Sequence, residues 1–450
     1  MSERQPSDPN APVVVLGAGM AGLGAALRLR DAGVPFLVFE ASAAYGGHTA
    51  SVRHPDGFVF DDGPHVSFTK NERVRALLSS FVDGAEWTQP IRIINYWKGL
   101  WLTHPIQMHL GEVPPELAVQ VLLEFVGLPP EPETIANYEE WLLASYGPTF
   151  ATTFPMVYGT KYHTTPPATL TTNWLGPRMY RPNLAEILEG AMGVERPSTH
   201  YVTEFRYPLE GGFGSYLRPF SSMNELRLRH EVTAVDPVAR IVTFANGHRQ
   251  PYSSLISSLP LPVLVERLVS ATEDVREAAQ RLSSTSVVVV NLGVAREDLA
   301  DAHISYVYDP DIVFARLNFP YRLAPSTVPA GASSVQAEIY VSERYKPLDG
   351  QPEDLIPRVI ADLTRMGVLR EDDRILHQDA HLARFANVIY DHDRSGALAP
   401  VLSHLSEVGI ATCGRYGLWN HHWTDESFVS GEQAAEAVLA RCDAGSLAAR

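Results

Sequence analysis

The sequence has very few cysteines and no long apolar segment. Among its 450 residues only Cys413 and Cys442 are cysteines, and they do not form a CxxC pair. This excludes a disulfide framework, and we expect two reduced thiols. There is no run of about 18 apolar residues, and the segment from Met1 to Pro12 is polar, unlike the apolar core of a signal peptide. We therefore expect a cytoplasmic protein with no membrane partner.

Positive charge is also scarce. The chain carries 36 Lys and Arg against 52 Asp and Glu, a formal net charge of −16. Such a surface repels phosphate backbones and anionic lipids, which argues against nucleic acid as a partner. A nucleotide cofactor stays compatible with this charge, because backbone dipoles can bind it locally. The length suits two domains of unequal size.

The start of the chain predicts a βαβ unit. An apolar run from Val13 to Leu16 is typical of a buried parallel strand, helix-forming residues follow from Ala21 to Leu29, and a second apolar run spans Phe36 to Phe39. Between the first strand and the helix lies the GxGxxG sequence Gly17-Ala18-Gly19-Met20-Ala21-Gly22, and Glu40 follows about 20 positions later. This context favours a dinucleotide site over a glycine-rich turn of another α/β fold.

Each residue type in this turn has a physical task. Gly17 permits a tight turn, Gly19 lets the backbone approach a pyrophosphate, and Gly22 lets helix and strand pack closely. The helix N-terminus offers free N–H groups to the phosphates, and Glu40 can accept hydrogen bonds from ribose hydroxyls. The expected contacts are Gly17, Gly19, Met20, Ala21, Gly22 and Glu40.

The rest of the chain alternates between regions with helix and loop patterns and regions with strand patterns. From about Asn95 to Tyr207, Trp, Tyr and Pro are frequent, and we expect helices and loops of a substrate-side region. Strand patterns return from Arg227 to Pro260, with a turn at Asn246-Gly247. Further segments are predicted as helices at Glu116 to Phe125, Leu184 to Met192 and Ser427 to Arg441, and as strands at Ile241 to Phe244, Ser286 to Leu292, Val335 to Val341 and Gly409 to Thr412.

Three further glycine motifs carry a resemblance to a known family. They are Gly46-Gly47-His48-Thr49, Gly63-Pro64-His65, and Gly414-Arg415 ahead of an amphipathic helix. With them, the chain resembles the flavin amine oxidase superfamily over nearly its whole length, in particular its protoporphyrinogen-oxidase-like and UDP-galactopyranose-mutase-like members. The resemblance implies FAD rather than NAD, since an extended FAD needs contacts from both ends of the chain.

The same resemblance implies roles for individual residues. Gly46, Gly47, His48 and Thr49 are similar to a second phosphate and ribityl contact, and Gly63, Pro64 and His65 to the segment that passes over the flavin ring. Val232 matches a strand whose backbone faces adenine. Gly414 and Arg415 match the motif that places a helix N-terminus beside the flavin. The cofactor-contact candidates from the resemblance are Gly46, Gly47, His48, Thr49, Gly63, Pro64, His65, Val232, Gly414, Arg415 and Trp419.

The candidates for catalysis and substrate binding are single residues, and their sequence context is less distinctive than that of the glycine motifs. By resemblance His65 lies near the flavin centre, and Lys161 could bind a water or an anionic substrate; the alternatives are a surface histidine and a solvated lysine. Arg178 and Arg316 could each bind a carboxylate or phosphate, or serve as structural ion-pair partners. The substrate candidates are Tyr158, Arg178, Tyr207, Arg316, Trp419 and Asn420, with His65 and Lys161 as catalytic candidates.

Two other chemistries find no support in the sequence. His421 and His422 are adjacent, so their side chains point apart, and no third ligand is suitably spaced. We therefore expect no bound metal. A GxSxG motif for Ser-His-Asp hydrolysis is missing, and Asp391, His392 and Asp393 are better explained as a polar loop.

These observations predict an α/β fold made of a Rossmann-type FAD-binding domain, with a central parallel sheet and a β-meander, and a mixed α+β substrate-binding domain. We assign residues 1–90, 205–265 and 395–450 to the first domain, and residues 91–204 and 266–394 to the second. The flavin ring is expected at their interface.

The expected function is FAD-dependent oxidation of a small molecule, with hydride passing to flavin N5 and dioxygen reoxidising the flavin. A flavin-dependent isomerase acting on a sugar nucleotide is the main alternative, although we find no paired tyrosine segment of the mutase type. A scaffold protein without a cofactor is a weaker alternative, because both glycine motifs and Glu40 are intact. The sequence identifies neither the substrate nor the oligomeric state, monomer or homodimer.

Overall fold

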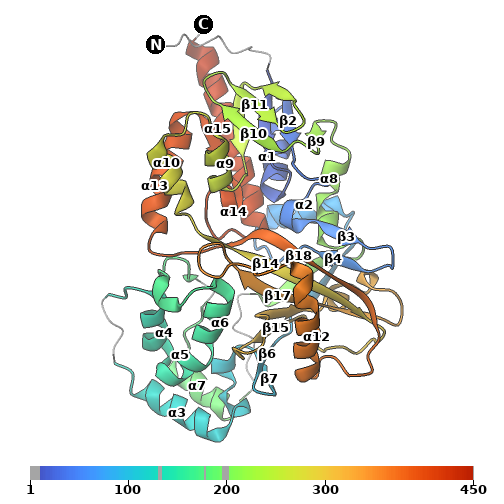
Figure 1. Cartoon of the computed structure of the whole chain (residues 1–450), viewed down its shortest axis with the longest axis vertical. Coiled ribbons are helices and arrows are strands. Elements are labelled where there is room, and N and C mark those ends of the chain that lie inside the picture. Colours follow the sequence, from blue (N-terminus) through green and yellow to red (C-terminus); the bar gives the residue numbers. More distant parts are fainter. Residues whose placement is uncertain (1–10, 130–133, 177–178, 195–201, 449–450) are drawn as a thin grey trace.

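A five-stranded parallel sheet forms the centre of one half of the molecule (Figure 1). We describe a computed structural model over residues 11–129, 134–176, 179–194 and 202–448. The sheet order is β19-β13-β1-β2-β9 and all neighbouring pairs are parallel. Its strands are β1 (Val13–Leu16), β2 (Phe36–Phe39), β9 (Leu226–Arg227), β13 (Ser254–Ser257) and β19 (Ile410–Thr412).

Both faces of this sheet are covered by helices. In β1, Val13 and Val15 belong to one buried cluster with α1 (Met20–Asp31) and α15 (Thr424–Ala448). Val14 and Leu16 belong to another cluster, on the side of α10 and α13. A strand buried on both faces reads as the continuous apolar run seen in the sequence. The helices around this sheet are also α8 (Arg218–Ser221), α9 (Leu261–Arg267), α10 (Glu273–Gln280), α13 (Arg394–Glu407) and α14 (Gly414–Gly417).

A second, mixed sheet of seven strands forms the other half, in the order β18-β14-β17-β16-β15-β6-β7. Alternate residues of its strands face opposite sides, so Val335, Ala337 and Ile339 pack with α12 (Ile356–Arg365) while Tyr340 faces Tyr158. The strands are β6 (Ile93–Trp97), β7 (Leu100–Thr103), β14 (Ser284–Val294), β15 (Ile304–Val307), β16 (Arg316–Asn318), β17 (Ser333–Val341) and β18 (Ile375–Val388).

Smaller elements complete the fold. A β-meander belongs to the half with the parallel sheet, a group of helices lies beside the seven-stranded sheet, and there are two ladders of two strands each (Figure 1). The meander is β10 (Val232–Asp236), β11 (Ile241–Phe244) and β12 (Arg249–Pro251), and the ladders pair β3 (Ser51–Arg53) with β4 (Val59–Asp61) and β5 (Glu86–Pro90) with β8 (Glu204–Pro208). The remaining helices are α2 (Glu72–Phe81), α3 (Pro115–Val126), α4 (Tyr138–Tyr146), α5 (Pro148–Thr153), α6 (Pro155–His163), α7 (Leu184–Ala191) and α11 (Pro320–Leu323).

The predicted fold class is confirmed: a Rossmann-type unit with a parallel sheet and a meander stands beside a mixed α+β unit. One expectation was wrong in detail. We expected helices and loops between Asn95 and Tyr207, but β6 begins at Ile93 and β7 ends at Thr103, and both join the seven-stranded sheet. β7 pairs with β6, and β6 joins the sheet through Ile304 to Val307, about 200 residues further along, so the local pattern alone did not reveal them. The domain boundaries stay a prediction.

Among the described residues, every helix is too short or too polar to cross a membrane.

Candidate active site

A cavity of about 620 Å³ lies between the two sheets. Its lining begins at the turn between β1 and α1, passes the start of α15, and ends on the inner faces of β16 and β17. Residues from both ends of the chain therefore border one continuous space.

The glycines of the first turn have different structural roles. Gly17 has φ +95°, and a Cβ there would lie 2.2 Å from the Ser258 Oγ. At Gly22 a Cβ would lie 2.0 Å from the Gly17 carbonyl oxygen, so this glycine allows the helix to pack on the turn. At Gly19 the nearest protein atom to a Cβ would be 3.7 Å away, and the residue borders the cavity. Only at Gly19 does the missing side chain leave room for something other than protein.

The cavity wall at this turn ends with an acidic side chain held by backbone amides. Glu40 accepts hydrogen bonds from the N–H groups of Ala18 at 3.0 Å and Ser42 at 2.9 Å. The amides fix the carboxylate while leaving lone pairs for hydroxyl donors. Val232 does not border the cavity within the described residues: it starts β10, and its carbonyl accepts a bond from the Arg267 Nε at 3.2 Å.

The second glycine pair packs directly against the first turn. The Gly46 N–H donates to the Ala18 carbonyl at 2.8 Å, and a Cβ on Gly47 would contact the Gly19 Cα at 3.5 Å. Both glycines have positive φ, +116° and +53°. The Thr49 hydroxyl closes the turn by donating to the Gly46 carbonyl at 2.8 Å. The residues Gly46, Gly47, His48 and Thr49 all line the cavity, as do Gly17, Gly19, Met20, Ala21 and Glu40.

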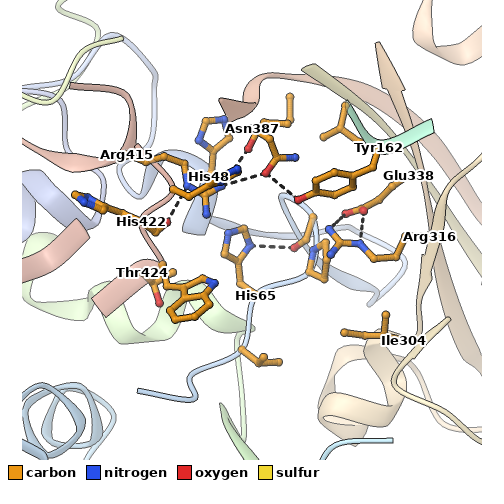
Figure 2. A pocket seen from close by; sticks show the side chains of 18 of the residues that line it. His48, His65, Tyr162, Ile304, Arg316, Glu338, Asn387, Arg415, His422 and Thr424 are labelled. Carbon is orange, nitrogen blue, oxygen red and sulfur yellow. Dashed lines mark hydrogen bonds and ion pairs between the residues drawn. The ribbon is translucent and has the colours of Figure 1, made fainter. Parts of the chain in front are cut away.

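The segment with His65 forms the middle of the cavity wall (Figure 2). The His65 Nδ1 lies 3.1 Å from the carbonyl of Gly63, and burial lowers the pKa of His65 to about 4, so the ring is neutral near pH 7. Next to it, the Asp62 carboxylate is paired with His381 at 2.6 Å. Gly63, Pro64 and His65 all line the cavity.

The late glycine motif, Gly414-Arg415, also borders the cavity. The Gly414 N–H donates to the Ser430 hydroxyl at 2.8 Å, so that amide is already used. Arg415 donates to the carbonyls of His422 at 2.8 Å and Ala386 at 3.1 Å. Gly414, Arg415 and Tyr416 of α14 border the cavity, and so do Thr424 and Ser427 in the first turn of α15, so the N-termini of both helices lie at the cavity.

Asn387 connects this region to the far end of the cavity. Its Oδ1 accepts a hydrogen bond from the Tyr162 hydroxyl at 3.0 Å and lies 3.4 Å from an Arg415 nitrogen (Figure 2).

The far end of the cavity is a chamber lined with aromatic rings, which we call the tyrosine chamber. Its tyrosines are Tyr138, Tyr146, Tyr158, Tyr162, Tyr180, Tyr306, Tyr308 and Tyr340.

A buried ion pair forms one wall of this tyrosine chamber. Arg316 contacts Glu338 through two hydrogen bonds of 2.5 and 3.0 Å and also donates to the Tyr340 hydroxyl at 3.0 Å. The Glu338 side chain is 2% exposed. Burial raises the pKa of Tyr158 well above its usual value, so that hydroxyl stays protonated. The charge of Arg316 is thus balanced inside the protein.

Several predicted site residues lie elsewhere. Lys161 was expected in the site, but its ammonium donates to the carbonyls of Val307 at 3.3 Å and Asp309 at 2.9 Å, at the end of β15. Burial lowers the pKa of Lys161 to about 7. Tyr158 and Tyr162, one helical turn apart, occupy the cavity side of α6, and Lys161 does not border the cavity within the described residues.

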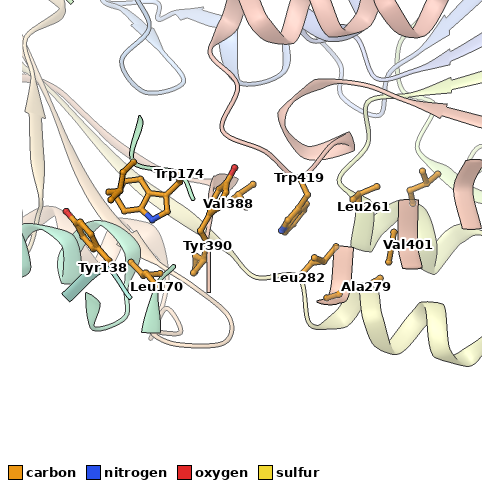
Figure 3. Close-up of a cluster of buried hydrophobic side chains, with 14 of the residues drawn as sticks. Tyr138, Leu170, Trp174, Leu261, Ala279, Leu282, Val388, Tyr390, Val401 and Trp419 are labelled. Atoms are coloured by element: carbon orange, nitrogen blue, oxygen red, sulfur yellow. The ribbon is translucent and has the colours of Figure 1, made fainter. Parts of the chain in front are cut away.

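Tyr207, Trp419 and Asn420 are also outside the described cavity lining. The Tyr207 hydroxyl donates to the buried Asp61 at 2.6 Å. Trp419 is fully buried and packs among Leu261, Leu282 and their neighbours (Figure 3). Asn420 accepts a hydrogen bond from Tyr390. Tyr207 and Trp419 are thus buried in the core, whereas Asn420 lies at the surface, and the described cavity lining includes none of the three. Arg178 lies outside the described residues.

The sequence analysis overlooked most of the tyrosine chamber. Gln336, Glu338 and Tyr340 alternate along β17, a pattern that places them on one face of the strand. This alternation of polar residues inside an otherwise apolar run was a usable signal. The spacing of Tyr158 and Tyr162 was another. By contrast, Tyr306 and Tyr308 lie in a short segment whose pairing depends on distant strands.

The cavity fits FAD. Open space beside Gly19 and Gly47 suits a pyrophosphate, because backbone can approach it closely there, and Glu40 suits ribose hydroxyls. The helix N-terminus of α15 and Arg415 provide positive potential further along.

Comparisons with known proteins agree with this geometry. Residues 15–81 match the NAD(P)-binding Rossmann-like domain, and residues 172–439 match the flavin containing amine oxidoreductase family. A phytoene desaturase (lycopene-forming) from Pantoea ananas is 47% identical over 55 residues, 12% of this chain and 11% of that protein. The chain thus matches only about a tenth of the length of that relative. A 4,4'-diapolycopene oxygenase from Methylomonas sp is 24% identical over 423 residues, 80% of this chain and 82% of that protein.

Two solved structures share the fold. A reduced UDP-galactopyranose mutase superposes with a TM-score of 0.89 at 24% identity, covering 96% of both chains. A putative protoporphyrinogen oxidase from Exiguobacterium sp. 255-15 has a TM-score of 0.74 at 14% identity, covering 95% of this chain and 98% of that one. With the family match over more than half of the sequence, the chain belongs to the flavin-containing amine oxidoreductases and is an FAD-dependent enzyme.

Proposed function

We propose that this enzyme oxidises a small, uncharged organic molecule whose reacting carbon enters the tyrosine chamber. In this reaction a hydride leaves that carbon and a proton leaves the neighbouring atom, which produces a C=N, C=O or C=C bond. Bound FAD supplies the hydride acceptor at N5, and dioxygen is the proposed final oxidant. The observation that carries the proposal is the neutralised Arg316 in a chamber of tyrosine rings.

Charge is the property that selects the substrate class. Within the described lining, Arg316 and Arg415 are the only Arg or Lys residues. Arg316 is paired with Glu338, and Arg415 donates to two carbonyls. A diphosphate would have to break the buried pair, leaving a carboxylate without its partner, which costs several kcal/mol. Tyrosine faces and protonated hydroxyls instead suit an aromatic or aliphatic body with a few polar groups.

The chain's own residues would contribute orientation and proton handling. The His65 Nδ1 faces the Gly63 carbonyl, so this nitrogen carries the hydrogen and Nε2 keeps a lone pair that can receive a substrate proton. Tyr162, fixed by Asn387, would orient the substrate. The aromatic walls exclude water, which places the C–H bond productively and protects the product.

An isomerase acting on a sugar nucleotide is the second candidate. Its support is the superposition on the UDP-galactopyranose mutase over 96% of the chain, and the abundance of tyrosines in the chamber. The two candidates differ in a measurable way: an oxidase takes electrons from its substrate, whereas the isomerase needs a flavin that has been reduced beforehand.

Anaerobic mixing separates them. Purified enzyme with bound FAD is mixed without oxygen with a panel of aromatic amines, alcohols and polycyclic compounds, all uncharged at neutral pH, and separately with UDP-galactopyranose. We expect bleaching of the flavin absorbance by at least one member of the panel, recovery on admitting oxygen, and no spectral response to UDP-galactopyranose. Tight binding of UDP-galactopyranose, together with its isomerisation only after chemical reduction, would contradict the proposal and establish the second candidate.

A further inference from the structure

A cluster of histidines and carboxylates lies outside the cavity, where the β3–β4 hairpin meets β18. His54 and Asp56 come from the hairpin turn, which is closed by hydrogen bonds between the backbones of His54 and Phe58 and of Gly57 and His54. His377 and Asp379 lie two residues apart on β18 and therefore point to the same side of the strand. Nothing in the proposed oxidation uses these four residues.

The potential ligand atoms of these side chains lie close together. The Asp379 Oδ2 lies 2.7 Å from the His377 Nε2 and 3.5 Å from the His54 Nε2. The three potential ligand atoms all lie within 4.8 Å of one another. In a tetrahedral zinc site with bonds of about 2.0 Å, ligand atoms are about 3.3 Å apart, so the Asp379–His377 distance would have to open by about 0.6 Å to complete the geometry.

We propose that His54, His377 and Asp379 bind a divalent first-row metal ion that prefers imidazole, Zn²⁺ above all, with water as the fourth ligand. Two imidazoles and one carboxylate suit Zn²⁺ better than Mg²⁺ or Ca²⁺, which prefer sets made only of oxygen. The His54 and Asp379 side chains are 22% and 31% exposed, so the ion has access from solvent.

The surroundings hold the ligands in place, as they do in established metal sites. The His377 Nδ1 lies 2.6 Å from an Asp56 oxygen, an arrangement that leaves Nε2 as the coordinating atom. The other oxygen of Asp379 accepts a hydrogen bond from the Asn291 amide at 2.8 Å. The rings of Phe58 and Phe60 lie 5.7 and 5.4 Å from that of His377 and form an apolar floor.

The position suggests what the ion does. Gln336 donates to both the Asn291 side chain and the Asp61 carbonyl, each at 2.9 Å. Asp61 ends β4 and directly precedes the segment Asp62 to His65 that lines the cavity. A metal ion would clamp the hairpin to the seven-stranded sheet and so stabilise that part of the cavity wall. The role is structural, and the ion takes no part in the oxidation.

Metal binding by the intact FAD-loaded enzyme tests the proposal directly. After treatment with EDTA and dialysis, Zn²⁺ is titrated into the enzyme in a calorimeter. We expect one ion per chain with micromolar affinity or tighter. His54→Ala removes a ligand from a partly exposed turn, and we expect it to weaken binding at least 100-fold. Asp56→Asn, which changes only the support of His377, should weaken binding about 10- to 100-fold.

His248→Ala is the matched control, since His248 is an exposed histidine next to the turn between β11 and β12. It should bind Zn²⁺ as the unaltered enzyme does. Retained flavin absorbance in each variant would establish that the fold is intact. If the enzyme and His54→Ala take up Zn²⁺ equally, or neither takes it up, the cluster is a histidine–carboxylate ion-pair network without a metal, and the proposal is wrong.

Discussion

Gly19 and Gly22 lie three residues apart in one turn, yet their missing side chains serve different partners. At Gly19 the backbone is extended, with φ −86° and ψ −169°, and any residue can adopt it. A side chain there meets no protein atom closer than 3.7 Å. At Gly22 the added carbon would overlap the Gly17 carbonyl oxygen at 2.0 Å. Proximity in sequence thus does not imply the same role.

We predict that Gly19→Val gives a folded protein that has lost FAD. The valine occupies space that the pyrophosphate needs, while its Cβ meets no protein atom closer than 3.7 Å. The ratio of flavin absorbance to protein absorbance should fall to near zero with an unchanged far-ultraviolet circular dichroism spectrum. Gly22→Ala, in contrast, should also lower the unfolding midpoint, because backbone has to move. A yellow Gly19→Val protein would argue against the pyrophosphate position.

The buried pair of Arg316 and Glu338 leads to a second prediction at this scale. Arg316→Met should destabilise the protein by about 3–5 kcal/mol, because it leaves the Glu338 carboxylate buried without its cation. The double variant Arg316→Met/Glu338→Leu should recover most of that loss. Denaturant titrations of both variants measure the loss and its recovery. If Arg316→Met is nearly neutral, Arg316 is not paired in solution, and a diphosphate-binding role becomes tenable.

At the scale of elements, the contact between helices α1 and α15 is built on glycines. A Cβ on Gly431 of α15 would lie 1.9 Å from the Ala21 carbonyl oxygen, and one on Gly24 of α1 would lie 2.0 Å from that of Phe428. The two helices cross with backbone against backbone. This contact places the first turn of α15, which begins at Thr424, at the cavity.

Gly431→Ala should therefore destabilise the protein by about 1–3 kcal/mol and shift the start of α15 away from the cavity. The temperature at which flavin fluorescence appears should fall by several degrees. Gly396→Ala is the control, because this glycine is in α13 and has no neighbouring atom within 4 Å of an added Cβ. That substitution should be neutral or stabilising by up to about 1 kcal/mol. Equal effects from both would contradict the close packing of α1 and α15.

Elements with a strong local pattern could be predicted from the sequence, whereas contacts between distant segments could not. The strand from Val13 to Leu16 was found with its bounds because it is buried on both faces and reads as one apolar run. Strand β6 was missed because its role depends on pairing with β15, about 200 residues away. In the site, Gly19 and Glu40 belong to a fixed local spacing, but the pairing of Arg316 with Glu338 appears only once β16 and β17 are neighbours.

Aromatic residues near a motif were especially misleading. Trp419 follows the Gly414-Arg415 motif and was expected at the cavity, yet its ring packs in the hydrophobic core beside Leu261 and Leu282 (Figure 3). Its backbone has φ +50°, so the chain turns sharply there. A side chain's direction after such a turn depends on backbone angles that local sequence does not specify.

At the scale of the whole molecule, several buried histidines lower the free energy of unfolding as the pH falls. Burial lowers the pKa of His65 and His303 to about 4 and that of His163 to about 3. In the unfolded chain these histidines take up protons near pH 6.5. Between about pH 6.5 and 4 the unfolded state therefore binds more protons, and the free energy of unfolding falls with falling pH. Each histidine contributes a loss of about 3 kcal/mol by pH 4.

Asp61 has the opposite effect on stability, but its contribution does not cancel the loss that the histidines cause. Burial raises the pKa of Asp61 to about 6, above its usual 3.8, so its stabilising contribution is complete below pH 3.8 and is lost as the pH rises through 6. By pH 4 this recovers about 2–3 kcal/mol, leaving a net loss on the order of 6 kcal/mol. That is comparable with the whole stability of many proteins. We therefore expect unfolding and release of FAD between pH 5 and pH 4, measured by flavin fluorescence.

His163 allows this acid sensitivity to be traced to one group. Its ring lies between Tyr162 and Trp174, and its Nδ1 has no hydrogen-bond partner among the described residues. A phenylalanine fits such an aromatic environment and cannot take up a proton, so His163→Phe should reduce the stability difference between pH 7 and pH 4 by about 3 kcal/mol. His392→Phe, at an exposed position, should leave the difference unchanged. If His163→Phe does the same, the acid lability arises from groups other than the buried histidines.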